Sequence, residues 1–481
     1  MTCLPRTQNM ASASCAFPRR AARLVCWFGI LFSAFALAEW TRLGVAAACL
    51  LICWTLRRPG CRLKFKGAWI AVRRGEYFAA MMLLAAAIVF RMACYLLHER
   101  YGLGIFQSAD ANQFWKWSQE MAAGSFPEVK SWTTVAAYAL CIKLFGNTLT
   151  PAYILNFMLH IATAGALLGF GCRLFGRGAG WLAAAVYLLS PTFVLMTFST
   201  LSEHFFFLFV ALSLLCAERW APDCRNRWLF GMSVCVWLAV WSRGEGLLVL
   251  GALGVCLGGL AVCRRTGWRS VLSLIVLYVL LSLSGALIGV SINLSTHGIC
   301  TFFCSNDNYW PRLHGANRKT KGRVTNKDLI YEQYSADHPG DPEGVMAKRK
   351  PNYCPPELIP YIKAETTRRW KAMSLPTKIR FIVEKEHFDW AHAFAGSGRT
   401  PVGGASAVLY EAAPAIILVL SLFGFARRLR RGECPMAWLE AAPLLVIGGM
   451  CGVLALYESN IRYGTMLLVF MPLYAQRGGK I

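Results

Sequence analysis

Residues 270–293 read SVLSLIVLYVLLSLSGALIGVSIN, a stretch without a single charged side chain. A helix needs roughly 20 predominantly apolar residues to cross the hydrocarbon core of a bilayer, so this stretch predicts a transmembrane helix. Residues 246–263, GLLVLGALGVCLGGLAVC, are equally free of charge. Arg264, Arg265 and Arg269 separate the two stretches, a pattern typical of two spans joined by a basic loop.

The whole chain has the composition of a membrane protein. It contains 481 residues, of which 56% are hydrophobic and only 16% are charged, and its mean hydropathy is +0.44. Soluble proteins carry about 25% charged residues, so the composition excludes both a water-soluble globule and a disordered chain. We therefore predict an all-α polytopic membrane protein.

Apolar segments recur along the chain and predict about 12 transmembrane helices. They lie at 21–39, 43–56, 77–97, 151–171, 179–199, 203–217, 228–242, 246–263, 270–293, 407–425, 437–457 and 463–476. The first segment follows Arg19 and Arg20 and ends near Ala36-Leu37-Ala38, a pattern that also resembles a cleaved signal peptide. Its apolar run is long for a signal peptide, which favours an uncleaved helix.

The net charge of +25 is explained by membrane topology. If the N-terminus is cytoplasmic, most Lys and Arg outside the stretch 294–406 fall in cytoplasmic segments, as the positive-inside rule requires. This distribution argues against a nucleic-acid partner. It predicts a multi-pass protein of the inner (plasma) membrane whose N- and C-termini are cytoplasmic.

Two segments, 98–150 and 294–406, are too long to be simple connections. Both fall on the non-cytoplasmic side in this topology, and their aromatic, Gly and Pro content predicts that they are folded. The helical run in the second is expected near 357–393. The chain then divides into an N-terminal hairpin with a basic loop (1–76), a core that includes the first outside loop (77–293), the large outside loop (294–406) and the C-terminal helices (407–481).

Asp110 lies at the start of a predicted amphipathic helix in the first outside loop. Phe114, Trp117 and Met121 recur at helical spacing after it, which predicts a short helix at the membrane interface. Asp is a good N-cap residue, so Asp110 has a purely structural interpretation as well as a functional one.

Ionisable residues within predicted spans are functional candidates because their burial in a bilayer is unfavourable. In the predicted topology all seven lie toward the outer ends of their spans, on the same side as both long loops, which suggests a polar cavity that opens outward. A structural role is open for each of them, since Arg91 can extend to the interface and Arg243 can pair with Glu245 or Glu203. The full set is Arg91, Glu203, His204, Arg243, Glu245, Glu458 and Arg462.

Several short motifs together resemble the C-type superfamily of lipid-dependent glycosyltransferases, in particular the branch of dolichyl-phosphate-mannose protein mannosyltransferases and bacterial aminoarabinose transferases. The likeness covers roughly 77–320 and 455–475. Its motifs, in order, are Ser108-Ala109-Asp110, Lys143-Leu144-Phe145-Gly146, Arg173-Leu174-Phe175-Gly176, Leu189-Ser190-Pro191, Leu201-Ser202-Glu203, Trp241-Ser242-Arg243-Gly244-Glu245-Gly246-Leu247 and Ile461-Arg462-Tyr463.

The chain departs from the family pattern at several positions. Ala111 replaces the second acid that many relatives carry after the loop Asp, and His204 and Gly244 stand where proline is usual. Trp132-Thr133-Thr134 replaces a Pro/Tyr-rich segment. These departures concern the donor and the acceptor more than the fold.

The resemblance implies transfer of a sugar from a polyprenyl-phosphate donor to a hydroxyl acceptor. Asp110 would then be the general base. Arg243 and Arg462, with Arg91 behind them, would contact the lipid phosphate, because arginine suits phosphate oxygens. Glu203 and Glu245 would hold these arginines or bind sugar hydroxyls.

No motif in the sequence requires a metal, and a divalent cation is left open. The cysteines and histidines show no zinc-site spacing. Two other classes remain as alternatives, a lipid or glycan transporter (flippase) and a non-catalytic membrane scaffold. A transporter typically has inverted halves and charges near the midplane, neither of which is evident here.

Overall fold

The computed structural model is helical throughout the part of the chain that it describes, and that part contains no strand. The described residues are 19–37, 76–101, 109–125, 127, 129, 131–223, 225–263, 268–297, 309–318, 328–339, 355–391, 405–430, 438–456 and 465–475. The predicted all-α polytopic class is therefore confirmed, whereas the number of spans remains a prediction.

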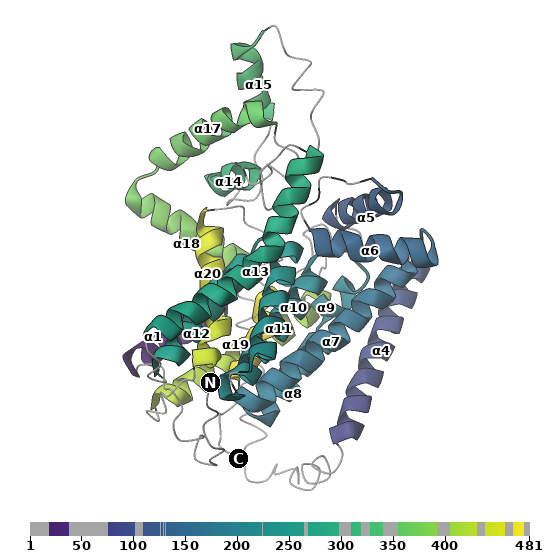
Figure 1. The fold of residues 1–481 in the computed structure, drawn as a ribbon, viewed down its shortest axis with the longest axis vertical. Coiled ribbons are helices and arrows are strands. Elements are labelled where there is room, and N and C mark those ends of the chain that lie inside the picture. Colours follow the sequence, from purple (N-terminus) through teal and green to yellow (C-terminus); the bar gives the residue numbers. More distant parts are fainter. Residues whose placement is uncertain are drawn as a thin grey trace.

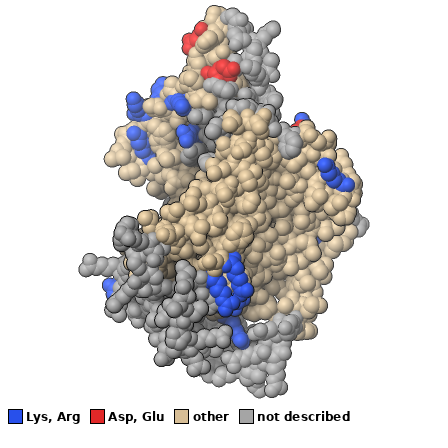
Figure 2. Space-filling view, viewed as in Figure 1, with Lys and Arg blue, Asp and Glu red and all other residues tan. Residues whose placement is uncertain are grey.

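The long helices form a bundle (Figure 1). They are α1 (Arg19–Leu37), α4 (Glu76–Tyr101), α7 (Thr150–Leu174), α8 (Arg177–Leu189), α10 (Glu203–Asp223), α11 (Asn226–Ser242), α12 (Gly246–Cys263), α13 (Trp268–His297), α19 (Ala405–Arg430) and α20 (Trp438–Leu456). Within the described residues, four segments are long and apolar enough to cross a membrane, namely Phe78–Leu96, Thr150–Leu174, Glu203–Pro222 and Leu272–Ile292. Figure 2 shows a broad belt without charged side chains over the middle of the molecule, as a lipid-facing surface requires.

Close helix packing in the bundle depends on small residues. A Cβ atom on Gly171 of α7 would lie 2.6 Å from the Cα of Gly180 in α8. Only glycine at both positions lets these two backbones approach so closely, a common device in membrane bundles. Large aromatic side chains such as Phe170, Tyr187 and Phe206 fill the buried core around this contact.

The predicted span 179–199 is wrong as a single helix. Helix α8 ends at Leu189, and the short helix α9 (Pro191–Met196) begins at the proline. Ser190 is extended, with ψ of 131°, because a residue before proline is disfavoured in the helical region. Residues 197–202 then lead to α10, with a turn rather than a helix in most of their length. The chain therefore changes direction twice between α8 and α10.

At the C-terminal end, the predicted span 463–476 is described as α21 (Thr465–Phe470) followed by the 3-10 turn η7 (Met471–Tyr474). Pro472 lies in that turn. The predicted span 43–56 falls outside the described residues.

Both long loops contain folded helices, as predicted, and these helices lie at the same end of the bundle (Figure 1). The first loop holds α5 (Ala109–Ala122) and α6 (Trp132–Phe145). The second holds α14 (Tyr309–Gly315), α15 (Asp328–Asp337), η5 (Pro356–Leu358), α17 (Ile359–Lys371) and α18 (Leu375–Ala391). The run expected near 357–393 is thus two helices with a break between them.

The second loop has a small apolar core of its own. Leu313, Ile330, Tyr331, Leu358 and Ile362 are buried together there. Helix α18 attaches this lobe to the bundle, because the fully buried Lys385 ammonium donates to the carbonyl of Gly315 at 3.4 Å and to that of Ala455 at 3.3 Å. These carbonyls lie in the last turns of α14 and α20, where a cation is favourable.

Candidate functional site

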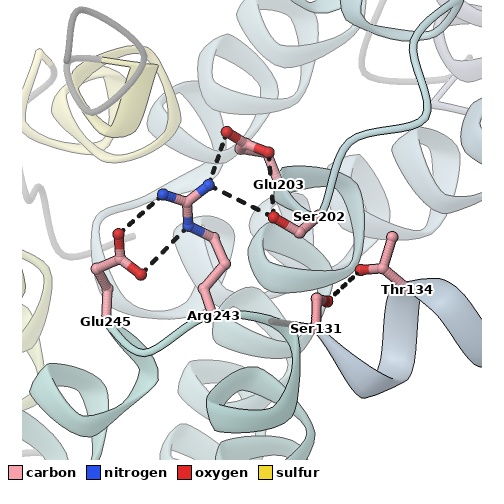
Figure 3. A network of polar contacts seen from close by, with 6 residues as sticks. All are labelled: Ser131, Thr134, Ser202, Glu203, Arg243 and Glu245. Carbon is pink, nitrogen blue, oxygen red and sulfur yellow. Dashed lines mark hydrogen bonds and ion pairs between the residues drawn. The ribbon is translucent and has the colours of Figure 1, made fainter. Parts of the chain in front are cut away.

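Arg243, Glu203 and Glu245 form one ion-pair network where α10 begins and α11 ends (Figure 3). Arg243 Nη1 lies 2.7 Å from Glu203 Oε1. Nη2 of the same guanidinium donates to Glu245 Oε1 at 2.8 Å, and Nε donates to Oε2 at 3.3 Å, so the contact with Glu245 is bidentate. Ser202 adds weaker contacts, since its hydroxyl lies 3.5 Å from Arg243 Nη1 and donates to Glu203 Oε2 at 3.3 Å.

A tight turn between α11 and α12 orients the arginine and its second acid. The backbone of Arg243 is extended as it leaves α11, and the Gly246 amide donates to the Arg243 carbonyl at 2.9 Å. A Cβ atom on Gly246 would lie 2.4 Å from the Val240 nitrogen, so this turn requires glycine. The chain folds back on itself here, so that Arg243 contacts Glu245 of the same turn as well as Glu203 at the start of α10.

The three charges are largely withdrawn from solvent. The Glu203 side chain is 3% exposed, and those of Arg243 and Glu245 are 13% and 15% exposed. Two carboxylates facing one guanidinium give the cluster a formal charge of −1 when all three are ionised. Removal of the arginine would break both of these buried ion pairs, which is strongly unfavourable. The structural pairing that the sequence left open for Arg243 is present with both glutamates.

Asp110 lies in the first turn of α5, one residue inside the helix, and its side chain is partly buried. A carboxylate there complements the positive N-terminal end of the helix. Thr200 donates from Oγ1 to the carbonyl of Ala111 at 2.6 Å, which ties this first turn directly to the 197–202 turn. Asp110 is thus one residue from a bond to the segment that carries Ser202 and Glu203.

Apolar packing fixes the rest of α5. Phe114, Trp117 and Met121 share one cluster with Trp132 of α6, as the helical spacing predicted. Trp241, two residues before Arg243, packs against the same cluster. Helix α6 begins with a buried pair, in which the Ser131 hydroxyl donates to Thr134 Oγ1 at 2.6 Å (Figure 3). Helix α5 is therefore held by the 197–202 turn, which leads to Glu203, and by Trp241, which precedes Arg243.

Arg91 belongs to a different set of contacts. It lies in α4 and is 4% exposed. Its guanidinium donates to Thr197 Oγ1 at 2.9 Å, to the Leu188 carbonyl at 2.8 Å and to the Ala87 carbonyl at 3.3 Å. Nη2 contacts His160 Nδ1 at 3.1 Å. The five described residues of the predicted ionisable set thus divide into two networks, which meet at the neighbouring residues Glu203 and His204.

Sequence reasoning missed Asn156 and His160, both fully buried in α7. They are four residues apart, so they share one face of a helix whose other residues are mostly apolar. Two polar residues at helical spacing inside a predicted span are a signal that could have found them. The predicted site residue Arg462, and Glu458 with it, lie outside the described residues. Within the described part of the chain, no three His, Cys, Asp or Glu side chains come together as metal ligands would.

Residues 131–292 match the family described as dolichyl-phosphate-mannose-protein mannosyltransferase. The predicted resemblance to this family is confirmed. The match includes Glu203, Arg243 and Glu245, whereas Asp110, Arg91 and Arg462 lie outside it.

Two solved structures are similar to the chain at low identity. They are ArnT from Cupriavidus metallidurans bound to undecaprenyl phosphate (15% identity, 82% of this chain and 76% of that chain, TM-score 0.35) and the same protein in the apo state (16%, 83% and 77%, TM-score 0.36). No curated protein sequence matches the chain.

Proposed function

We propose that this chain is a membrane glycosyltransferase that moves a sugar from a polyprenyl-phosphate donor to a hydroxyl acceptor. The observation that carries the proposal is the place of the ion-pair network within the family match. The three charged residues at 203, 243 and 245 all lie in the matched segment, and they come together in space. A bond from Thr200 links them to the helix that begins beside Asp110.

In the proposed reaction, Asp110 accepts the proton of the acceptor hydroxyl as its oxygen attacks the anomeric carbon. The bond between that carbon and the phosphate oxygen breaks, and the lipid phosphate leaves with the electron pair. A hydroxyl is a weak nucleophile at neutral pH, so the step needs a general base, and a carboxylate within hydrogen-bond reach can serve as one. The products are the glycosylated acceptor and the free lipid phosphate.

The leaving phosphate gains negative charge, and a fixed guanidinium stabilises such charge. We assign this task to Arg243 and Arg462. Glu203 and Glu245 hold the Arg243 guanidinium in one orientation, since the contacts at 2.7 and 2.8 Å fix it from two sides. Orientation matters here because a planar fork recognises two phosphate oxygens at once.

The test is release of lipid phosphate by the purified chain. The donors would be undecaprenyl-phosphate-linked radiolabelled hexoses and pentoses, offered with cell-envelope lipid and protein fractions as acceptors. We expect free undecaprenyl phosphate and labelled acceptor with at least one donor, and none with heat-inactivated protein. Transfer of an intact donor across a vesicle membrane, with no cleavage, would support the flippase alternative. EDTA in the same assay decides the open question of a divalent ion.

We further propose that the end of the bundle that carries α5, α6, α14, α15, α17 and α18 faces outward and that both termini are cytoplasmic. The basic residues between predicted spans support this orientation. Single cysteines introduced near residues 60–70 and 427–431 should resist a membrane-impermeant reagent in intact cells, and those near 110 and 340 should react. Labelling of the 294–406 stretch only after permeabilisation would reverse the orientation.

A further inference from the structure

Four buried polar side chains surround the turn at 197–202. Arg91 reaches it from α4, Asn156 and His160 from α7, and His204 from the first turn of α10. Arg91 is 4% exposed, and the other three are fully buried. Polar groups at such a place persist only when they are hydrogen-bonded, so their partners reveal what they do.

The two histidines and the arginine form a chain of hydrogen bonds with one direction. His204 Nε2 lies 2.9 Å from the Ser199 carbonyl, which can only accept, so this nitrogen carries the proton. His204 Nδ1 must then accept, and it receives a bond from His160 Nε2 at 2.8 Å. His160 Nδ1 accepts in turn from Arg91 Nη2 at 3.1 Å. Both rings are neutral in this assignment. The hydrogen-bond chain ends at the Ser199 carbonyl, which can only accept, so the chain is not a path for proton transfer.

The groups that receive these bonds are the backbone carbonyls freed by the breaks around α9. Leu188 is in the last turn of α8, and its carbonyl accepts from Arg91. Asn156 Nδ2 donates to the carbonyls of Thr197 at 3.1 Å and Ser199 at 3.0 Å. Asn156 Oδ1 accepts from the Tyr138 hydroxyl at 2.7 Å, which fixes the orientation of the amide. Irregular backbone at membrane depth requires such satisfaction within the protein.

The turn held in this way is the connection between the two parts of the candidate site. Thr200 bonds to the carbonyl beside Asp110, and Ser202 and Glu203 contact Arg243. We propose that Arg91, His160 and His204 are positioning residues that hold the 197–202 turn, and through it set Asp110 against the Arg243 network. The catalytic part of this inference rests on the proposed function. It gives Arg91 a role in the scaffold in place of a contact with the lipid phosphate.

The key variant is His204→Leu, which removes the donor to Ser199 and the acceptor for His160. Hydrogen–deuterium exchange should rise by roughly tenfold in peptides that cover 197–203 and 110–114, since a lost buried hydrogen bond is of that order. Turnover in the lipid-phosphate release assay should fall at least as much, with KM for the donor within about twofold. His204→Gln keeps a donor at the position of Nε2 and should restore both readouts.

Ser213→Ala is the matched control, because Ser213 is also buried in α10 but bonds only to Val210 in its own helix. It should change neither exchange at 197–203 nor turnover. If His204→Leu does not fold, His204→Asn replaces it, since the shorter amide keeps an acceptor toward His160 but cannot reach Ser199. The same local rise in exchange is expected.

Unchanged exchange at 197–203 in the His204→Leu or His204→Asn protein would overturn the inference. So would a rise spread evenly over all helices together with a lower melting temperature, because that result describes ordinary core residues. The exchange measurement needs no substrate. If the wild-type chain releases no lipid phosphate, the proposed function fails while the role of the histidines in the turn is still decided.

Discussion

Arg91 and Arg243 are both largely withdrawn from solvent, and their surroundings are opposite in kind. Arg243 faces two carboxylates, Glu203 and Glu245, at 2.7 and 2.8 Å. Among the described residues, the partners of Arg91 are carbonyls, a threonine hydroxyl and a neutral histidine, together with the Phe157 ring, whose centre is 4.8 Å from its guanidinium carbon. The first arginine balances charge, and the second supplies hydrogen-bond donors to backbone. Their removal should therefore fail in different ways.

The largest expected effect is on turnover and concerns Asp110 rather than either arginine. The variant distinguishes a catalytic role of this residue from a structural one. Asp110→Asn keeps the size of the side chain, but asparagine carries no charge and cannot accept a proton at neutral pH. The lost interaction with the N-terminal end of α5 is worth only about 0.3–1 kcal/mol. We expect turnover to fall by roughly 10²–10⁴-fold, the range for loss of a general base. Melting temperature in detergent should stay near that of the wild type. Full turnover of this variant would leave Asp110 with a helix-terminus role only.

Arg243→Met should produce the next largest change. It removes the guanidinium that pairs with both Glu203 and Glu245, and breaking a buried ion pair by removal of one partner destabilises proteins by about 3–5 kcal/mol. Thermal unfolding in detergent would measure the loss. The triple variant Arg243→Met, Glu203→Gln, Glu245→Gln should regain most of the stability but not undecaprenyl phosphate binding.

The control for the Arg243→Met variant is Arg173→Met, in the last turn of α7. Arg173 also pairs with a glutamate, Glu218, but at 3.5 Å and with 44% of its side chain exposed. Exposed pairs contribute little, so a small change is expected. If the triple variant regained donor binding with its stability, Arg243 would have no direct part in binding the phosphate.

Arg91→Met should destabilise the protein without any rescue by removal of acids. The variant leaves the Leu188 carbonyl without its donor, and a buried group left unpaired costs about 1–3 kcal/mol. The Thr197 hydroxyl loses one bond but still donates to the Phe193 carbonyl at 3.0 Å. We expect Glu203→Gln to have no compensating effect in this background. Recovery of stability in the Arg91→Met, Glu203→Gln protein would mean that Arg91 balances the charge of Glu203, and the two arginines would then not differ in kind.

The smallest expected effect concerns Glu365 in the lobe formed by the second loop, where an acid is paired with two arginines. Arg368 and then Arg369 donate to this carboxylate at 2.6 and 2.8 Å, and together they hold its pKa below the usual value, although burial opposes the shift. Stability from these pairs is therefore complete above the unfolded-state pKa of about 4.3 and is lost as the pH falls through the lower folded-state pKa.

Glu365→Gln should accordingly raise amide exchange in α17 slightly at neutral pH and leave it unchanged at a pH below the folded-state pKa. Arg380 and Glu384 form an exposed pair in α18 at 2.8 Å and provide the control. Glu384→Gln is expected to change exchange in α17 at neither pH. An effect of Glu365→Gln that grew as the pH fell would contradict the assignment.

The sequence predicted the membrane fold and part of the site because those features are local. Apolar runs such as 246–263 need no partner to be recognised, and Glu245 is only two residues from Arg243. Pro191 indicated a break after Ser190, but the apolar residues continue on both sides of it, so 179–199 was predicted as one span. His160 and His204 could not be paired in advance, since they are 44 residues apart and their bond exists only after α7 packs on α10. His204, which stands where proline is usual in the family, thus forms hydrogen bonds with His160 and with the Ser199 carbonyl.

The placement of Arg91 also bears on the order in which the protein is assembled. Its partners His160, Leu188 and Thr197 all follow α4 in the chain, so they are synthesised after it. Until then, the arginine interrupts the apolar segment Phe78–Leu96 without these acceptors, and a charge within such a segment raises the free energy of insertion, by about 2.5–3.5 kcal/mol at the helix centre and by less toward its end. Only 11% of the most apolar window of this segment is buried in the finished bundle. We therefore expect α4 to reach its final depth late, when α7 to α9 provide the acceptors that receive its guanidinium.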